Sequence, residues 1–470
     1  MFKNFFTKSI SLYDFLRKSA VIIFVLVFIS VCMFSKPSYA GDVKELKHQK
    51  NTFDASPDTG HSIDVARSKG HVIAQRYSPA GSIITEINTG QILWSENRNV
   101  EWTPASMSKL MTIALAYDAI RDKKISLDTV VTVKEKHVRI GKNSKLSNNN
   151  MQLGCTYTVA EIIDLIIVPS SAAATYLMMD LLAPDIDTYV AMLNKKAAEL
   201  NMVNTRYVNP VGVLNYLLGE YAPSGDPNDD NYTSPQDYAC LCSYLVENYP
   251  DLLNHTKHAN IVVKQGTKYE EKFHGYNFSL EGTKYAFPGA DGIKTGSARN
   301  GYNYSMTAKR GNTRMIEIVL GVSKWEDLDG EYYRHPIGNA ILEDAFAKYE
   351  YKKILDKGIY KIDGKTIEIV KPLYDCVPKK WKADFVCDFK KNTIKAKIVN
   401  REYLPGYSEP STKFTLTEET AAESATSGSI IKRIISIVII VLILLIVLSI
   451  IRYRNIQARR KYRRRRRHHR

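Results

Sequence analysis

Two uncharged apolar runs, one near each end of the chain, constrain its fold most. Ala20 to Phe34 follows a basic segment and precedes the small-residue site Ser38-Tyr39-Ala40. This order is typical of a secretory signal peptide cleaved after Ala40; a retained membrane helix is the alternative, but the run is short for a span. Ile434 to Ile451 has eighteen residues and no charge. As a helix it is about 27 Å long, which fits the ~30 Å core of a bilayer. The globular part therefore lies between these runs.

The C-terminal segment after the second run is strongly basic. Arg452 to Arg470 holds eleven Lys/Arg and no Asp or Glu, within a chain whose formal net charge is +16. Such a block can bind nucleic acid. Beside an apolar span it more simply fixes orientation, because the positive side stays in the cytoplasm and contacts anionic lipid. We expect a single-pass protein of the cell membrane, with its folded part outside, its tail inside and no nucleic-acid partner.

The cysteines do not form a disulfide framework. Six are present, and removal of Cys32 with the signal peptide leaves an odd number. Cys240 and Cys242 are too close in a helical stretch to bridge easily, whereas Cys376 and Cys387 are candidates to link two strands. No Cys/His spacing resembles a zinc site. We expect no structural metal and no cofactor.

A serine and a lysine three residues apart, Ser106 and Lys109, form the first candidate site. If Ser106 opens a helix, Lys109 lies one turn away on the same face. A serine hydroxyl is a weak nucleophile until a base takes its proton, and a charged ammonium cannot do so. Burial and the positive end of a helix dipole both favour the uncharged amine. The alternative is an ordinary helical turn with a solvated lysine, because Ser-x-x-Lys is common by chance.

A second serine lies at a corner between two predicted helices. Val159 to Val168 is apolar with a helical period and stops at Pro169, and another helix is predicted over Ala172 to Leu182. Ser170 and Ser171 lie between them. Such a corner can push a hydroxyl into a cleft, or it can be a plain helix–helix turn.

Two β-hairpins flank the helix-rich middle of the chain. Each joins two alternating segments through a turn that contains glycine, Asn88-Thr89-Gly90 or Arg310-Gly311-Asn312. The predicted strands are 82–87, 91–95, 302–307 and 315–322.

The tripeptide Lys294-Thr295-Gly296, followed by Ser297, opens a further predicted strand. A cationic lysine beside a threonine hydroxyl suits a substrate carboxylate. Gly296 would let a substrate backbone approach closely. Alone, Lys-Thr-Gly is a frequent tripeptide at a strand end.

In this order the three motifs resemble the set found in penicillin-binding proteins and serine β-lactamases. The segments around them are similar to the D-alanyl-D-alanine carboxypeptidases of the low-molecular-mass penicillin-binding class. The resemblance covers about Ala80 to Tyr351. The segments that carry it are Asn88 to Leu93, Pro104 to Thr112, Tyr207 to Gly212 and Asp291 to Gly296.

The resemblance implies a mixed α/β fold, in which an antiparallel sheet is flanked by helices and joined to a helical lobe. A small β domain often follows in this family, and alternating segments at 365–370, 381–388 and 393–399 agree with an abbreviated one. Residues 41–77 are polar without a sustained period. We expect a signal peptide at 1–40, a polar spacer at 41–77, a DD-peptidase catalytic domain at 78–351, a small β domain at 352–405, a linker at 406–433, a transmembrane helix at 434–451 and a basic cytoplasmic tail at 452–470.

The resemblance also implies catalytic roles for three residues. Ser106 would attack the carbonyl between two terminal D-alanines and form an acyl-enzyme. Lys109 would accept the proton of Ser106, and Ser170 would relay a proton to the leaving amine. The substrates would be peptidoglycan stem peptides, and β-lactam antibiotics would be covalent inhibitors of Ser106.

The residues after them would bind the substrate. Lys294 would polarise the proton relay through Ser170. Together with Thr295 it would also hold the terminal carboxylate of the substrate, and Gly296 completes this Lys-Thr-Gly motif. The backbone N–H groups of Ser106 and Ser297 would form an oxyanion hole.

One motif departs from the family pattern. Ser-x-Asn is expected at the corner, but the chain has Ser170-Ser171-Ala172, and alanine cannot replace an amide. The first hypothesis is a membrane-anchored serine D-Ala-D-Ala carboxypeptidase with altered substrate contacts. The alternatives are a DD-endopeptidase or β-lactamase of the same fold, and a non-catalytic protein that binds peptidoglycan.

Overall fold

The computed structural model describes residues 43–50, 52–417, 436, 440, 443, 444, 447, 448 and 450–460. The predicted signal peptide lies outside these residues, as do parts of the predicted linker, membrane segment and basic tail. Within the described residues no helix is both long and apolar enough to cross a membrane. The chain divides into a smaller unit (1–45, 359–368 and 415–470) and a larger one (46–358 and 369–414).

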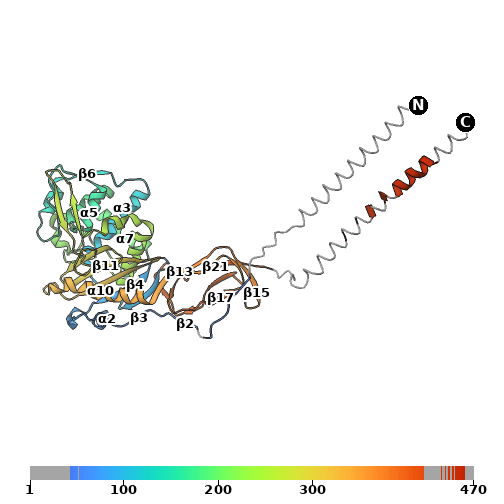
Figure 1. The fold of residues 1–470 in the computed structure, drawn as a ribbon. Coiled ribbons are helices and arrows are strands. Elements are labelled where there is room, and N and C mark those ends of the chain that lie inside the picture. The colour runs from blue at the N-terminus through green and yellow to red at the C-terminus, as the bar shows by residue number, and fades with distance from the viewer. Residues whose placement is uncertain are drawn as a thin grey trace, which may run out of the picture. The chain divides into compact units, whose positions relative to one another are not determined.

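A seven-stranded sheet lies at the centre of the larger unit (Figure 1). The strand order is β10-β11-β12-β4-β5-β20, with antiparallel neighbours, and β3 pairs with β5 in parallel. The strands are β3 (Asp58–Thr59), β4 (Gly81–Glu86), β5 (Gln91–Glu96), β10 (Ala290–Ala298), β11 (Gly301–Arg310), β12 (Thr313–Val322) and β20 (Glu402–Tyr403).

Both predicted hairpins are confirmed as β4–β5 and β11–β12. Their turns contain Gly90 at φ 67° and Gly311 at φ 59°, the left-handed conformation that glycine adopts at little cost. In the first turn the Glu86 carboxylate accepts hydrogen bonds from both the backbone and the side chains of Asn88 and Thr89.

The two faces of the sheet pack against different helices. Because side chains alternate along a strand, Ile316, Ile318 and Leu320 of β12 join the core of the helical lobe, while Glu317 points the other way. There the carboxylate of Glu317 lies against Gly338 of α10 (Asp329–Lys348). Helix α10 packs on this face, and α2 (Ser62–Ser68) packs against α10 (Figure 1). Helix α8 (Pro235–Asn248) packs against β12 and β4, and its buried residues belong to the core of the helical lobe.

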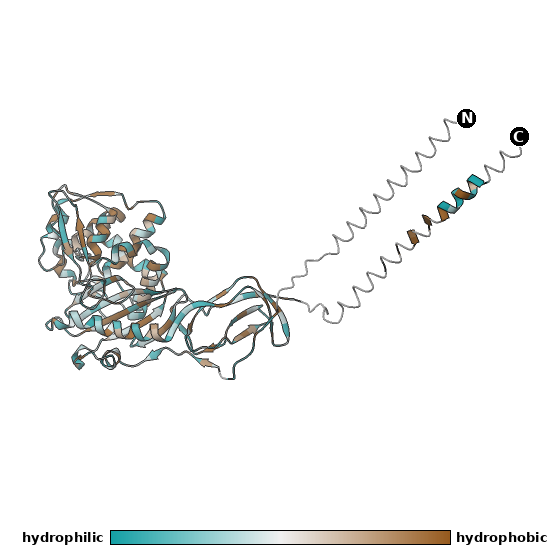
Figure 2. Cartoon of the chain, in the orientation of Figure 1, coloured by the Kyte–Doolittle hydropathy of each residue, from teal (hydrophilic) through white to brown (hydrophobic). Residues whose placement is uncertain are grey.

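The helical lobe contains the helix that begins at Lys109. Its apolar segments appear brown among the more polar outer loops in Figure 2. The two helices predicted around Pro169 are confirmed, and Thr158 and Glu161 cap the first of them through a capping box. The lobe helices are α3 (Lys109–Arg121), α4 (Glu135–Gly141), α5 (Val159–Ile167), α6 (Ala172–Leu182), α7 (Ile186–Glu199) and α9 (Leu253–Thr256).

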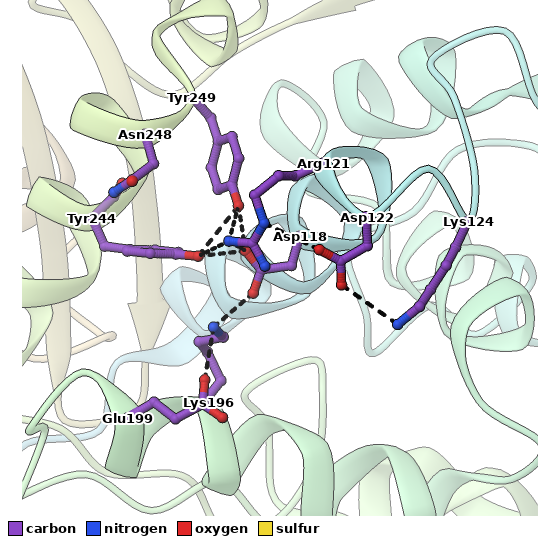
Figure 3. A network of polar contacts seen from close by, with 9 residues as sticks. All are labelled: Asp118, Arg121, Asp122, Lys124, Lys196, Glu199, Tyr244, Asn248 and Tyr249. Carbon is purple, nitrogen blue, oxygen red and sulfur yellow. Dashed lines mark hydrogen bonds and ion pairs between the residues drawn. The ribbon is translucent and has the colours of Figure 1, made fainter.

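A polar network ties the end of α3 to α7 and α8 (Figure 3). The carboxylate of Asp118 lies 2.6 Å from the Lys196 amine and accepts hydrogen bonds from the hydroxyls of Tyr244 and Tyr249. Burial would raise the pKa of Asp118, but these hydrogen bonds outweigh it and lower the pKa. The helix that carries Lys109 is therefore fixed at its far end.

Short strands make up the remaining β structure. In the larger unit β13 pairs with β16, β17 with β18, β18 with β21, β19 with β2, β6 with β7 and β8 with β9; in the smaller unit β1 pairs with β14. These strands are β1 (Lys44–Glu45), β2 (Phe53–Asp54), β6 (Val130–Thr132), β7 (Thr156–Thr158), β8 (Asn260–Val263), β9 (Glu271–His274), β13 (Tyr349–Leu355), β14 (Gly358–Ile362), β15 (Lys365–Ile369), β16 (Leu373–Pro378), β17 (Phe385–Asp388), β18 (Thr393–Ala396), β19 (Ile398–Val399) and β21 (Thr412–Leu416).

Three expectations about the organisation of the chain differ from the structure. The segment 406–433, expected to be a linker, contains β21, which pairs with β18 and buries Phe414. The segment 41–77, expected to be a polar spacer, contains β3 and α2, and α2 buries Ile63 and Ala66 against the fold. The candidate disulfide between Cys376 and Cys387 is also absent, since Cys376 carries a free, buried thiol. The reason is topological: Cys376 lies on β16, which pairs with β13, whereas Cys387 lies on β17, which pairs with β18.

Candidate active site

Ser106 lies in a tight turn that runs directly into α3. Residues Ala105–Ser108 form a 3₁₀-helix, η2, and α3 begins at Lys109. Positions three residues apart eclipse one another in a 3₁₀-helix, so Ser106 and Lys109 share one side. Ala105 has φ 53°, a left-handed conformation that costs a non-glycine residue roughly 1–2 kcal/mol. Strain of this kind directly before a candidate nucleophile is typical of functional sites.

Two glycines, Gly212 and Gly296, allow their segments to pack directly against this strained turn, because a side chain at either position would collide with its backbone. A Cβ on Gly212 would lie 1.9 Å from the Ala105 carbonyl oxygen, and one on Gly296 would lie 2.5 Å from that of Pro104. The Asn303 side chain also donates to the Thr103 carbonyl at 2.9 Å. The sequence predicts that Gly296 lets a substrate backbone approach closely. In the structure, the space where another residue would carry its Cβ is instead occupied by the turn that holds Ser106.

The Lys109 amine lies against the Ser106 hydroxyl. The distance from Lys109 Nζ to Ser106 Oγ is 2.8 Å, and Nζ also donates to the Val211 carbonyl at 3.1 Å. Lys109 is only 1% exposed. Burial lowers the pKa of its amine to about 7, so a large share is uncharged at neutral pH.

The loop that presents the Val211 carbonyl is held by two buried asparagines. Asn209 Oδ1 accepts from the backbone N–H of Val211 at 3.1 Å and of Gly212 at 2.8 Å. Asn231 Nδ2 donates to Ser108 Oγ at 2.8 Å and so joins this loop to η2. The sequence singled out the segment 207–212, but nothing in it indicated that a backbone carbonyl would be the second partner of Lys109.

Ser170 and Lys294 form a second serine–lysine pair. Lys294 Nζ lies 3.0 Å from Ser170 Oγ and 3.0 Å from the Thr295 carbonyl oxygen. Both side chains are buried, and Ser170 has φ 60°. Burial, together with the charges of Lys109 and Arg334, lowers the pKa of Lys294 well below its usual range. A substrate carboxylate beside Lys294 would favour its charged form again.

Arg334 is a residue of the site that sequence reasoning missed. Its side chain is fully buried beneath β10 and donates to the carbonyl oxygens of Gly296 at 3.2 Å and Tyr276 at 3.2 Å. It also reaches Ser297 Oγ at 3.5 Å. Burial lowers the pKa of Arg334 to about 10. The residue fixes the end of the Lys-Thr-Gly strand, but a single arginine gives no sequence signal of this contact.

The structure thus brings the predicted catalytic residues together in two pairs, Ser106 with Lys109 and Ser170 with Lys294. A hydroxyl in contact with an uncharged amine can pass its proton to that amine as it attacks a carbonyl carbon. Thr295, Gly296 and Ser297 follow Lys294 along β10, beside η2. This arrangement is chemically suited to acyl transfer through a serine.

Fold and site together define the class of penicillin-binding serine peptidases. Residues 71–324 match the D-alanyl-D-alanine carboxypeptidase family, peptidase family S11, and this is more than half of the chain. The protein belongs to this family, as the three motifs predicted. Residues 351–415 match a domain of unknown function, DUF1958.

Curated relatives agree with the family. The chain is 27% identical to D-alanyl-D-alanine carboxypeptidase DacF of Bacillus subtilis over 270 residues, 57% of this chain and 62% of the relative. It is 25% identical to D-alanyl-D-alanine carboxypeptidase DacA of Haemophilus influenzae over 299 residues, 61% of this chain and 65% of the relative. The matches therefore span less than two thirds of each of these relatives.

Solved structures show the same fold. A peptidoglycan synthesis regulatory factor (PBP3) from Streptococcus pneumoniae superposes with a TM-score of 0.61 at 22% identity, over 72% of this chain and 98% of that one. Penicillin binding protein 6B from Escherichia coli superposes with a TM-score of 0.57 at 19% identity, over 78% of this chain and 100% of that one. The expected mixed α/β, penicillin-binding-protein-like fold is confirmed.

Proposed function

We propose that the protein is a serine-type D-Ala-D-Ala carboxypeptidase that removes the terminal D-alanine from peptidoglycan stem peptides. The observation that carries this proposal is the buried Lys109 amine 2.8 Å from Ser106 Oγ. Family membership supplies the reaction, and the relatives' names supply the substrate class. β-Lactams are proposed to acylate the same hydroxyl.

In the proposed first step, Ser106 Oγ attacks the carbonyl carbon between the two D-alanines, and its proton passes to Lys109. The backbone N–H groups of Ser106 and Ser297 would stabilise the oxyanion that forms, an effect typically worth a few kcal/mol per donor. Lys294 and Thr295 would hold the terminal carboxylate.

In the proposed second step, the C–N bond breaks and the leaving amine takes a proton from Ser170. The 3.0 Å contact between Ser170 Oγ and Lys294 Nζ lets Lys294 replace that proton. D-Alanine then leaves, and the proton held by Lys109 returns through solvent to Lys294, which restores both amines. Water then hydrolyses the ester on Ser106, with the uncharged Lys109 taking the proton of the water and returning it to Ser106.

Release of D-alanine from a peptide ending in D-Ala-D-Ala tests this proposal. The Ser106→Ala variant should lose at least about 10³-fold in kcat, because a nucleophile and its base act as a unit. Ser68→Ala, which changes an exposed serine of α2, is the matched control and should keep full activity. D-Alanine release by Ser106→Ala at the parent rate would refute the proposal. Slow hydrolysis of a penicillin adduct would favour a peptidase, and rapid hydrolysis a β-lactamase.

We also propose that residues 434–451 anchor the protein in the cell membrane, with the catalytic domain outside and the basic tail in the cytoplasm. The support is the uncharged run of membrane length followed by a basic block. Deletion of 434–470 should move the protein from the membrane fraction to the soluble fraction. Retention of the shortened protein in the membrane fraction would contradict the anchor.

A further inference from the structure

The serine corner that lacks the family asparagine is covered by another segment of the chain. Ala172, which stands where Ser-x-Asn has its amide, is 0% exposed. Its backbone N–H donates to the Ser147 carbonyl at 2.9 Å. Ser147 belongs to the loop 142–155, which joins α4 to β7. The corner is therefore in contact with this loop at the missing position.

The loop brings two asparagine side chains to the corner. Asn149 Oδ1 accepts a hydrogen bond from Ser171 Oγ at 2.7 Å, and Asn148 Oδ1 accepts one from the Ala173 backbone N–H at 2.9 Å. The first N–H groups of a helix need such acceptors because no earlier turn provides them. Ser171 caps α6 itself, since its Oγ accepts from the Ala174 N–H at 3.0 Å. Ser171 is thus held from both sides.

The asparagines are themselves held in place. Asn149 is only 4% exposed, and its Nδ2 donates to Glu271 Oε2 of β9 at 3.3 Å. The other carboxylate oxygen of Glu271 accepts from the Asn150 backbone N–H at 3.0 Å. Asn148 Nδ2 donates to the Ile140 carbonyl at 2.9 Å. A buried amide with both ends bonded has little freedom to rotate, so its oxygen is a fixed acceptor for Ser171.

Ser170 is the neighbour that this arrangement affects. It precedes Ser171 directly, has the left-handed φ of 60°, and places its Oγ 3.0 Å from Lys294 Nζ. A non-glycine residue stays in this conformation only where its surroundings over-determine it. We propose that Asn149 is a positioning residue for the proton relay: it holds Ser171 so that Ser170 stays in contact with Lys294. This inference rests on the proposed function.

The proposal predicts different effects on the cleavage of two kinds of substrate. An amide releases an amine, which must be protonated as the C–N bond breaks, whereas a thioester releases a thiolate that needs no proton. A displaced Ser170 should therefore slow cleavage of an acyl-D-Ala-D-Ala peptide and spare the matching acyl-D-Ala thioester. A general loosening of the site would slow both equally.

The experiment measures kcat/KM of the full chain on both substrates. Asn149→Ala should lose about 10–100-fold on the peptide and less than about threefold on the thioester, and Ser170→Ala should show the same pattern. Asn150→Ala is the matched control, because Asn150 is exposed and meets Glu271 through its backbone N–H. It should retain parent rates on both substrates.

A double variant with a reversed hydrogen bond distinguishes a loss of positioning from a variant that fails to fold. The double variant Asn149→Asp with Glu271→Gln keeps an acceptor for Ser171 and exchanges donor and acceptor between the two side chains. It should recover most of the peptide activity. The inference is overturned if Asn149→Ala loses activity equally on both substrates, or if it keeps parent activity on the peptide. It is also overturned if the double variant folds but does not recover activity on the peptide. If the parent protein cleaves neither substrate, the proposed function fails and the inference fails with it.

Discussion

The protonation state of Lys109 is the residue-scale feature on which the chemistry depends. The amine contacts two oxygen atoms, Ser106 Oγ and the Val211 carbonyl oxygen. Burial lowers its pKa to about 7. An amine with that pKa is a stronger base than water, and a substantial share of it is uncharged at neutral pH.

The acylation rate should therefore follow the uncharged fraction of Lys109. Below pH 7 the rate should fall about tenfold per pH unit, and above pH 7 it should level off, because the base must lack a proton before it can accept one. Stopped-flow acylation by a chromogenic cephalosporin between pH 5 and pH 9 measures this. Lys109→Arg should lose at least about 10³-fold at every pH, since a guanidinium stays charged; Lys123→Arg, on the surface, should keep the parent profile. A parent rate independent of pH would contradict a lysine base.

The same residue scale shows why only part of the site was predictable. The spacing of Ser106 and Lys109 follows from helix geometry, and Lys294 was found because its motif is continuous in sequence. The contacts of Arg334 and Asn149 are long-range, to residues 38 and 22 positions away in sequence, and leave no local pattern. The Val211 contact uses a backbone carbonyl, which every residue has. The roles assigned to Ser106, Lys109 and Ser170 stay predictions.

At the scale of elements, β12 contributes side chains to the packing on both faces of the sheet. Its even-numbered apolar residues pack on the helical lobe, but Glu317 faces α10, where Gly338 leaves room for its carboxylate. Within the described residues neither carboxylate oxygen has a hydrogen-bond partner. Burial raises the pKa of Glu317 well above its usual range, so folding favours its protonated form.

The contribution of Glu317 to the stability of the parent should therefore decline as the pH rises above about 4.5, because Glu317 then ionises in the unfolded chain but stays protonated in the folded one. One such group changes the free energy of unfolding by at most about 1.4 kcal/mol per pH unit. Glu317→Gln removes the effect, so its melting temperature relative to the parent should increase between pH 5 and pH 8. Thermal unfolding at several pH values measures this, with the exposed Glu281→Gln as control. A constant difference between Glu317→Gln and the parent would show that Glu317 is ionised in the fold.

At the scale of the whole molecule, regular patterns were predictable and irregular packing was not. The hairpins, the helices on either side of Pro169 and the penicillin-binding-protein-like fold are confirmed, because period-two and helical patterns are local and strong. Helix α2 was missed because only Ile63 and Ala66 of its short, polar sequence reach the core. The separation of Cys376 and Cys387 depends on strand order, which the sequence of either strand does not contain.

The most direct test of the central claim, that Ser106 is the nucleophile, is intact-protein mass spectrometry after incubation with a penicillin. The parent protein should gain the mass of one penicillin, and peptide mapping should place it on Ser106. Ser106→Ala should gain none under the same conditions. An unmodified parent protein, or an adduct that persists in Ser106→Ala, would contradict the claim.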